Sequence, residues 1–300
     1  MDYEVIIIGA GAAGVSCALW LKQLGVSALL LEVNAEVGGI CAQNPFIDSW
    51  NALQSDMTGL ETAKRLQATV EQWQLPLQTH SRVLRLDQQA NQAGFRVQCQ
   101  SHIFSAKFVV LASGVHFKRA ESVQQLAPDS PVRQAIIVGA SPALNKYDFR
   151  GKKVAVLGGG DNAFENAIRL LQQGHLESLQ IFARHVRARQ RFVAQIPNTM
   201  VQVGAYDFDA EHLRVNQQAF DVVLVFYGYE PTLAYAQHLP LKRDAKGYLI
   251  PDFSSCEMNI PNLYAIGELS QRQHPSVVTA MADGVCAAVA IARQAENLKH

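Results

Sequence analysis

The chain opens with a pattern of apolar positions typical of a strand, a tight turn and a helix. Residues 4–8 are mostly apolar and β-branched, as in a buried parallel strand, and residues 15–24 form an apolar helical stretch. A further apolar run at residues 27–31 predicts a second strand. Residues 9–14, with the sequence Gly-Ala-Gly-Ala-Ala-Gly, separate the first strand from the helix. We therefore expect a strand–helix–strand unit here.

The same order of elements recurs in the middle of the chain. Residues 153–157 predict a strand, and residues 158–163 supply a Gly-x-Gly-x-x-Ala turn. An amphipathic helix is predicted over residues 164–173, and the next strand over residues 178–183. Strands that alternate with helices predict an α/β fold. Two such turns predict two Rossmann-like dinucleotide-binding domains in one chain.

The first turn has the features that a bound dinucleotide requires. Gly9 allows the tight turn, Gly11 lets a pyrophosphate approach the backbone, and Gly14 lets the helix pack closely on the strand. The N-terminus of the helix presents backbone N–H groups to the phosphates. Glu32 follows the second strand, 23 residues after Gly9, where a carboxylate can accept hydrogen bonds from a ribose diol. An ordinary glycine-rich loop is the alternative, and the surrounding strand, helix and acid favour the dinucleotide.

The second turn is followed by basic residues where the first is followed by an acid. After the strand at residues 178–183 come Arg184, His185, Arg187 and Arg189. A cationic cluster at this position favours a 2′-phosphate, because guanidinium groups bind phosphate through paired hydrogen bonds. A solvated loop is the alternative. We therefore predict NADPH at the second turn and FAD at the first. The predicted NADPH-binding residues are Gly158, Gly160, Asp161, Asn162, Ala163, Arg184, His185 and Arg189.

Composition narrows the class of protein. The chain has 300 residues, of which 49% are hydrophobic, enough for about two domains with buried cores. Lys and Arg number 26, as do Asp and Glu, and this balance argues against a nucleic-acid or membrane binder. The five scattered cysteines include no Cys-x-x-Cys pair, which argues against a structural zinc site. The first residues lack the basic region of a signal peptide, so we expect a cytoplasmic protein.

The chain resembles the low-molecular-weight thioredoxin reductase family of flavoproteins over nearly its whole length. The segments that carry the resemblance are residues 9–14 with Glu32, 37–40, 49–50, 57–61, 111–114 and 263–268. The resemblance implies a discontinuous FAD-binding domain of residues 1–113 and 245–300. It also implies an inserted NAD(P)H-binding domain of residues 114–244, and a homodimer.

The first turn and the resemblance together assign a set of residues to FAD. They are Gly9, Gly11, Ala12, Ala13, Gly14, Glu32, Gly38, Gly39, Ile40, Ser49, Val83, Ala112, Ser113, Gly114, Gly267, Glu268, His274, Pro275, Ser276 and Val277. Glu268 replaces the usual Asp of the family, and residues 275–277 replace its Arg-Gln-Ala. A helix predicted from residue 278 onward can direct its N-terminal dipole to the flavin. His274 contacts the flavin or is an ordinary loop histidine.

The redox Cys-x-x-Cys of the reductases is missing. Ser141 and Leu144 stand where the two cysteines should be. Disulfide relay requires an attacking thiolate and a resolving thiol, so ordinary thioredoxin reductase activity through this position is excluded. Ferredoxin/flavodoxin–NADP reductases of the same type also lack the dithiol. Cys17 and Cys41 are predicted to be buried structural residues, with a redox role as the alternative.

We therefore predict an enzyme that transfers electrons from NADPH through FAD to a non-dithiol acceptor. A ferredoxin, a flavodoxin, a quinone and a small oxidant are the candidate acceptors. Because cofactors carry this chemistry, no catalytic side chain and no metal is predicted. A local group of cations, Lys118, Arg119, Arg150, Lys152 and Lys153, is a candidate docking patch. The alternatives are a flavoprotein reduced by another donor such as ferredoxin, and a non-catalytic regulatory module that binds FAD and NADPH.

Overall fold

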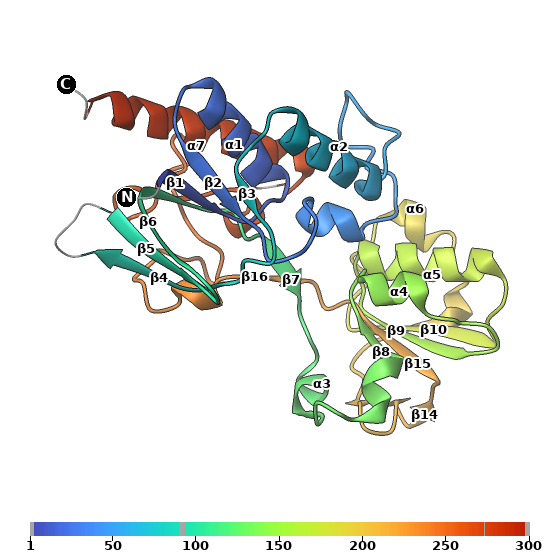
Figure 1. Ribbon diagram of the computed structural model, residues 1–300. Coiled ribbons are helices and arrows are strands. Elements are labelled where there is room, and N and C mark those ends of the chain that lie inside the picture. Colours follow the sequence, from blue (N-terminus) through green and yellow to red (C-terminus); the bar gives the residue numbers. More distant parts are fainter. Residues whose placement is uncertain (1–2, 90–93, 273, 298–300) are drawn as a thin grey trace. The chain divides into compact units, whose positions relative to one another are not determined.

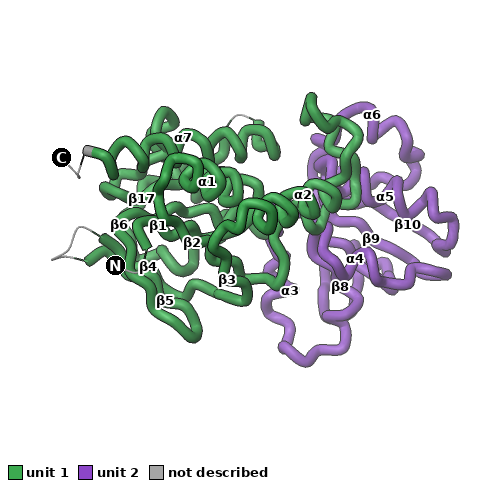
Figure 2. The backbone as a smooth tube through the Cα atoms, turned by 45° about the horizontal axis from the view of Figure 1, so that its top comes forward, with its two compact units in different colours: residues 1–116, 230–300 green, residues 117–229 purple. Residues whose placement is uncertain are grey.

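The computed structural model describes residues 3–89, 94–272 and 274–297 (Figure 1). The chain divides into two compact units, one of residues 1–116 and 230–300 and the other of residues 117–229 (Figure 2). The sequence placed the second boundary later, at 244/245. Residues 230–244 belong to the first unit because Leu233, Tyr235 and Leu241 are buried in its core.

The first unit is built on a mixed sheet. Its strands lie in the order β3 (Leu77–Gln78), β2 (Ala28–Leu31), β1 (Tyr3–Ile8), β6 (Ile103–Leu111), β5 (Gly94–Cys99) and β4 (Val83–Gln89), with β17 (Leu263–Ala265) also paired to β6. The strands β1, β2, β6 and β17 run parallel, whereas β4, β5 and β6 are antiparallel. The predicted pair of strands around the first turn is thus confirmed.

Helices cover one face of this sheet. The helices α1 (Ala12–Gln23) and α7 (Val277–Asn297) lie side by side, and α2 (Gly59–Gln72) lies next to α1 (Figure 1). Along β1, Val5 and Ile7 pack in the core beneath these helices, while Ile6 and Ile8 pack in the core on the opposite face. This alternation is the period of two expected of a strand that is buried on both faces.

Among the described residues, α7 is the one helix that is long and apolar enough to cross a membrane. It packs on α1 so closely that a Cβ atom on Gly284 would lie 2.5 Å from the carbonyl oxygen of Ala13. Its residues Ala287, Ala288 and Ile291 are fully buried in the core of the first unit. Part of the apolar surface of α7 is therefore accounted for by helix packing in this core.

The second unit contains a five-stranded parallel sheet. Its order is β11 (Val201–Val203), β10 (Ser178–Ala183), β9 (Lys153–Leu157), β15 (Val222–Val225) and β8 (Ile136–Val138). The helix α5 (Asp161–Gln173) follows β9, as predicted. The smaller elements are α3 (Glu121–Gln125), α4 (Pro142–Lys146), α6 (Gln190–Val193) and the sheet of β12 (Phe208–Asp209), β13 (Arg214–Val215) and β14 (Gln218–Ala219). Where the chain passes between units, β7 (Val115–Phe117) pairs with β16 (Tyr229–Pro231).

Candidate functional site

The first glycine-rich turn connects β1 to α1 under tight steric limits. Gly9 has φ +112°, and a Cβ atom there would overlap the carbonyl oxygen of Ala112. A Cβ atom on Gly14 would overlap the carbonyl oxygen of Gly9, which is the close packing expected from the sequence. The helix begins at Ala12 without a side-chain cap on its first N–H groups. These N–H groups are therefore available to a ligand phosphate.

Glu32 lies beside this turn and is only 4% exposed. Its carboxylate accepts a hydrogen bond from the backbone N–H of Ala10 at 2.9 Å. It accepts two more, each at 2.9 Å, from the backbone and side chain of Asn34. The acid thus fixes the turn from within the protein, and its contact with a ribose stays a prediction.

A second pair of glycines approaches the first turn. Gly38 donates a backbone hydrogen bond to Ala10 at 2.9 Å, and a Cβ atom on Gly39 would lie 3.2 Å from the Cα atom of Gly11. Ile40 follows within the 3-10 helix η1 (Gly39–Gln43). The structure therefore brings these two predicted FAD segments together.

The third predicted segment, residues 112–114, follows the end of β6. Ala112 donates a backbone hydrogen bond to Ile8 at 2.9 Å, which places it next to the turn. The hydroxyl of Ser113 donates to the carbonyl oxygen of Thr232 at 2.7 Å and lies 2.8 Å from the hydroxyl of Tyr235. This hydroxyl therefore fastens the returning chain, a role that the sequence did not suggest. The structure places the predicted residue Ser49 on an exposed turn and Val83 at the start of β4.

Glu268 has the strongest features of a ligand-binding acid. It lies in the 3-10 helix η5 (Gly267–Leu269), directly after β17, and burial raises the pKa of its carboxyl. Within the described residues, no hydrogen bond or ion pair to this carboxyl is found. A half-buried carboxyl without a protein partner is suited to accept hydrogen bonds from the hydroxyls of a ligand. With the uncapped helix and the glycine cradle, it fits a flavin dinucleotide.

Cys41 is a neighbour of this acid. Burial, together with the charges of Glu268 and Asp48, raises the pKa of the Cys41 thiol to about 12. Burial likewise raises the pKa of Cys17. Both thiols stay protonated near neutral pH, so neither is the thiolate that disulfide chemistry requires. The structural interpretation of both cysteines is supported.

The segment before α7 is held by local contacts. The His274 ring lies 4.6 Å from the ring of Trp50, measured between centroids, and sequence reasoning had not singled out this partner. The Ser276 hydroxyl accepts a hydrogen bond from the Thr279 N–H at 3.2 Å, and the Thr279 hydroxyl accepts one from the Ser276 N–H at 3.0 Å. These are reciprocal bonds of the capping-box type, which a Ser-x-x-Thr spacing allows.

The second turn, after β9, is fastened to the basic segment. Gly158 has φ +146°, and a Cβ atom on Gly159 would overlap the carbonyl oxygen of His185. The carbonyl oxygen of Gly159 accepts backbone hydrogen bonds from Arg187 at 2.6 Å and Ala188 at 2.9 Å. The structure thus brings the predicted turn and the predicted cations together. Sequence reasoning missed Gly159, which has no assigned place in the Gly-x-Gly-x-x-Ala pattern.

The two predicted phosphate-binding arginines lie in different surroundings. Arg184 is exposed beyond the end of β10, as is His185. Arg189 donates to the carboxylate of Asp161 from its backbone at 2.8 Å and from its Nε atom at 2.6 Å. Asp161 lies in the first turn of α5, so Arg189 offsets its charge at the mouth of the turn. Arg184 is therefore the more accessible cation for a phosphate.

Other predicted residues of the second unit have structural partners. The Asn162 amide donates to the Tyr229 hydroxyl at 2.9 Å, and Ala163 is fully buried. Leu144, which the sequence analysis placed at one of the missing cysteine positions, is buried in the core, and Ser141 is the N-cap residue of α4.

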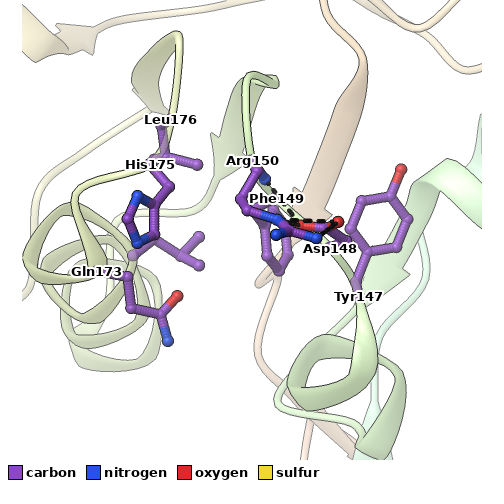
Figure 3. Close-up of a pocket in the computed structure, with 8 residues that line it drawn as sticks. Tyr147, Asp148, Phe149, Arg150, Gln173, His175 and Leu176 are labelled. Carbon is purple, nitrogen blue, oxygen red and sulfur yellow. Dashed lines mark hydrogen bonds and ion pairs between the residues drawn. The ribbon is translucent and has the colours of Figure 1, made fainter.

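A pocket of about 260 Å³ lies in the second unit between residues 147–150 and 170–176 (Figure 3). Arg150 and Asp148 form an ion pair of 2.7 Å on one side of it, and His175 lies on the other. Because Gln173 is the last residue of α5 and His175 follows it, the pocket is at the opposite end of this helix from the glycine-rich turn. None of the predicted NADPH-binding residues lines it.

Replacing Glu268 by Gln is expected to change how stability depends on pH. A carboxyl with a raised pKa in the folded state favours its protonated form, so its contribution is complete at low pH and is lost as pH rises through that pKa. The FAD-free E268Q variant should therefore gain stability over the wild type as pH rises from 5 to 8. Urea unfolding at both pH values measures this difference. The same difference at pH 5 and pH 8 would contradict the assignment.

Comparisons with known proteins give a consistent family. Residues 3–284 match the family model described as pyridine nucleotide-disulphide oxidoreductase. The chain is 24% identical to a thioredoxin reductase of Treponema pallidum, over 100% of this chain and 99% of the relative. It is 26% identical to a ferredoxin–NADP reductase of Granulibacter bethesdensis, over 90% of this chain and 82% of the relative.

Solved structures share the fold. A thioredoxin reductase of Lactococcus lactis aligns with a TM-score of 0.80 at 21% identity, over 98% of this chain and 99% of that chain. A bacillithiol disulfide reductase of Staphylococcus aureus aligns with a TM-score of 0.77 at 16% identity, over 97% and 98% of the two chains. These matches confirm the predicted resemblance, fold class and enzyme class, and FAD and NADPH are the cofactors of the matching family. The chain belongs to the pyridine nucleotide-disulphide oxidoreductase family of FAD-dependent enzymes.

Proposed function

We propose that this chain is an NADPH-dependent FAD oxidoreductase whose electron acceptor is not a dithiol. One observation carries the proposal: both dinucleotide turns are intact, whereas Ser141 and Leu144 occupy the positions of the redox cysteines. The two turns therefore point to an enzyme with a different final step.

The first unit would bind FAD, which supplies the electron-transfer chemistry when it is bound. The N-terminus of α1 would hold the pyrophosphate, and Glu32 would lie near the adenosine ribose. Glu268 would accept hydrogen bonds from the hydroxyls of the ribityl chain of FAD, since its carboxyl has no partner among the described residues. The N-terminus of α7, with Ser276 and Val277, would face the pyrimidine end of the ring.

The second unit would bind NADPH. The helix α5 begins at Asp161, and its N-cap residue, Gly160, has no side chain to occupy the first N–H groups. These groups are therefore as available to a phosphate as those of α1. The exposed guanidinium of Arg184 would bind the 2′-phosphate, and the backbone bonds between Gly159 and residues 187–188 would keep the basic segment at the turn. No protein acid or base is needed, so the chain contributes binding and orientation.

A ferredoxin-type carrier is the acceptor that we favour. Relatives named ferredoxin–NADP reductase include the Granulibacter bethesdensis protein and one of Leuconostoc citreum, which is 24% identical to this chain. The predicted docking cations are partly neutralised, because Arg150 pairs with Asp148 and Lys153 with Glu177. We therefore expect docking to rely less on charge than the sequence suggested.

Acceptor assays with NADPH as the donor test this proposal. Ferredoxin, flavodoxin, a quinone and an oxidised thioredoxin are offered separately to the FAD-loaded protein. We expect turnover with ferredoxin or another non-dithiol acceptor, and none with thioredoxin. Rapid reduction of the thioredoxin disulfide would contradict the proposal.

A homodimer is proposed by resemblance to the family, and light scattering should then give twice the 32.9 kDa of one chain.

A further inference from the structure

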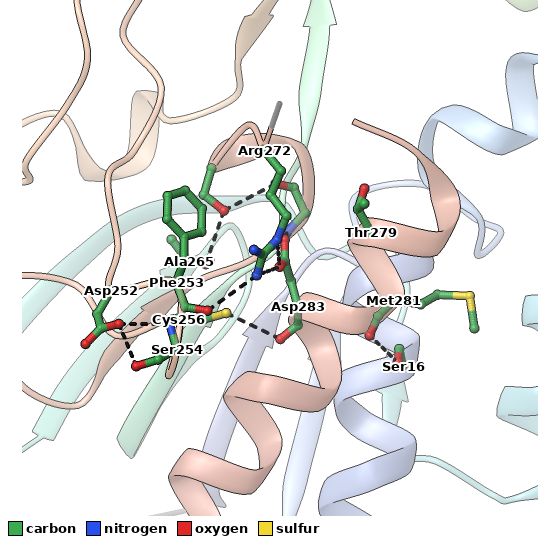
Figure 4. A network of polar contacts seen from close by, with 12 residues as sticks. Ser16, Asp252, Phe253, Ser254, Cys256, Ala265, Arg272, Thr279, Met281 and Asp283 are labelled. Carbon is green, nitrogen blue, oxygen red and sulfur yellow. Dashed lines mark hydrogen bonds and ion pairs between the residues drawn. The ribbon is translucent and has the colours of Figure 1, made fainter. Parts of the chain in front are cut away.

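Asp283 is a buried acid in the apolar helix α7. It is 2% exposed, and its Oδ2 atom accepts a hydrogen bond from the backbone N–H of Gly267 at 3.2 Å. Its Oδ1 atom accepts a hydrogen bond from the Nε atom of Arg272 at 2.6 Å and lies 2.6 Å from the Nη2 atom in an ion pair (Figure 4). One carboxylate therefore joins α7 both to η5 and to the loop that leads into α7.

We call the contacts of Asp283 with Gly267 and Arg272 the Asp283 clip. Further contacts hold Arg272 and Asp283 in place. The Arg272 guanidinium lies over the Phe253 ring, 4.9 Å from its centroid, and donates to the Phe253 carbonyl oxygen at 3.4 Å. The Cys256 thiol donates to the backbone carbonyl oxygen of Asp283 at 3.6 Å (Figure 4). The loop of residues 252–256 is thus attached to the same place.

The clip acts on the segment that carries Glu268. Gly267 has φ +68°, and a Cβ atom there would lie 2.9 Å from the Cβ atom of Ala13 in α1. The position of Glu268 therefore follows from how its neighbour Gly267 is held between α1 and α7. Asp283 also lines a small pocket together with Glu268 and Ser276, two residues assigned to FAD.

A buried charge is costly unless it is paired and fully hydrogen-bonded. An apolar side chain would pack in α7 without this cost, but it could not accept the N–H of Gly267. The acid is thus explained by what it holds. The hydrogen bond from Gly267 connects this buried pair to the segment that carries Glu268, and this connection gives the acid a role.

We propose that Asp283 is a positioning residue for the flavin-binding segment. Its carboxylate fixes the backbone at Gly267, and with it Glu268, while Arg272 holds the carboxylate in place through its hydrogen bond. The inference rests on the proposed function only in that FAD is the ligand whose affinity depends on this segment.

The test replaces Arg272 by Met and compares the FAD affinity of this variant with that of a control variant, in which another arginine of the same unit is removed from its ion pair. Arg85 also donates from its Nε atom to an aspartate, Asp87, at 2.8 Å, and this pair on β4 is more exposed than the pair of Arg272 and Asp283. We expect Arg272→Met to raise the dissociation constant for FAD roughly tenfold or more, because one buried partner is left unpaired. Arg85→Met should leave it unchanged, and Arg272→Lys, which keeps the charge, should restore most of the affinity.

A second measurement does not depend on FAD. In the FAD-free protein, hydrogen exchange of the segment around Gly267 should become faster in Arg272→Met and Asp283→Asn, and should stay unchanged in Arg85→Met. Equal FAD affinity and equal exchange in Arg272→Met and Arg85→Met would overturn the inference. A wild-type protein that binds no FAD would instead overturn the proposed function, and the exchange data would still decide whether the clip exists.

Discussion

Alanine at Gly160 is expected to abolish reduction of the flavin by NADPH while FAD stays bound and the fold stays intact. A Cβ atom at this position would meet no atom of the described residues within 4 Å, and the backbone φ of −96° suits any residue. Only a ligand that lies against the backbone can therefore sense the methyl group. We expect the second-order rate constant for reduction of the flavin by NADPH to fall at least about 100-fold. A small misplacement of a substrate has an effect of this size.

Gly11→Ala is the matched variant in the first unit. A Cβ atom there would lie 3.8 Å from the nearest protein atom outside the turn, the Cα atom of Gly39, which is an ordinary contact. This variant should lose FAD, whereas Gly160→Ala should keep it. Anaerobic reduction traces and the FAD content of the two purified proteins measure the difference. Normal reduction of Gly160→Ala by NADPH would show that no pyrophosphate binds at the second turn.

Replacing Arg184 by Gln is expected to remove most of the preference for NADPH. Arg184 is exposed at the end of β10, whereas Arg189 is already bonded to Asp161. The loss of a charge-assisted bond to phosphate should lower the efficiency with NADPH by about 30- to 100-fold, or about 2–2.7 kcal/mol. The efficiency with NADH should change little, because NADH carries no 2′-phosphate.

Arg214, on β13 of the same unit, provides the control for this charge. It is exposed and lies in none of the predicted segments. Steady-state kinetics of Arg184→Gln and Arg214→Gln with both nucleotides separate a specific contact from a general effect of net charge. An equal loss with NADPH and NADH in Arg184→Gln would contradict a 2′-phosphate contact.

The regular elements around both turns were predictable because their patterns are local. Strands at residues 153–157 and 178–183 lie where the apolar runs predicted them, and the helices after both turns begin three residues earlier than predicted. The earlier start has a simple reason: Ala12 and Asp161 already adopt helical conformation within the turn motif. Hydrophobic periodicity cannot mark that position.

The remaining features depend on contacts between distant residues. The chain between residues 230 and 244 gives no sign in its sequence that Tyr235 binds Ser113 and packs in the first unit. The pairing of Arg189 with Asp161 spans 28 residues, and Asp283 reaches Gly267 from a helix whose pattern is otherwise apolar. Such polar contacts follow from the assembled fold and leave no periodic pattern in the sequence.

The most direct test of the account is rapid mixing of the purified, FAD-loaded protein with NADPH, and separately with NADH, in the absence of oxygen. We predict rapid loss of the visible flavin absorbance with NADPH and much slower loss with NADH. A flavin that stays oxidised with both nucleotides would contradict the central claim, and would indicate another electron donor or a protein that binds these nucleotides without turnover.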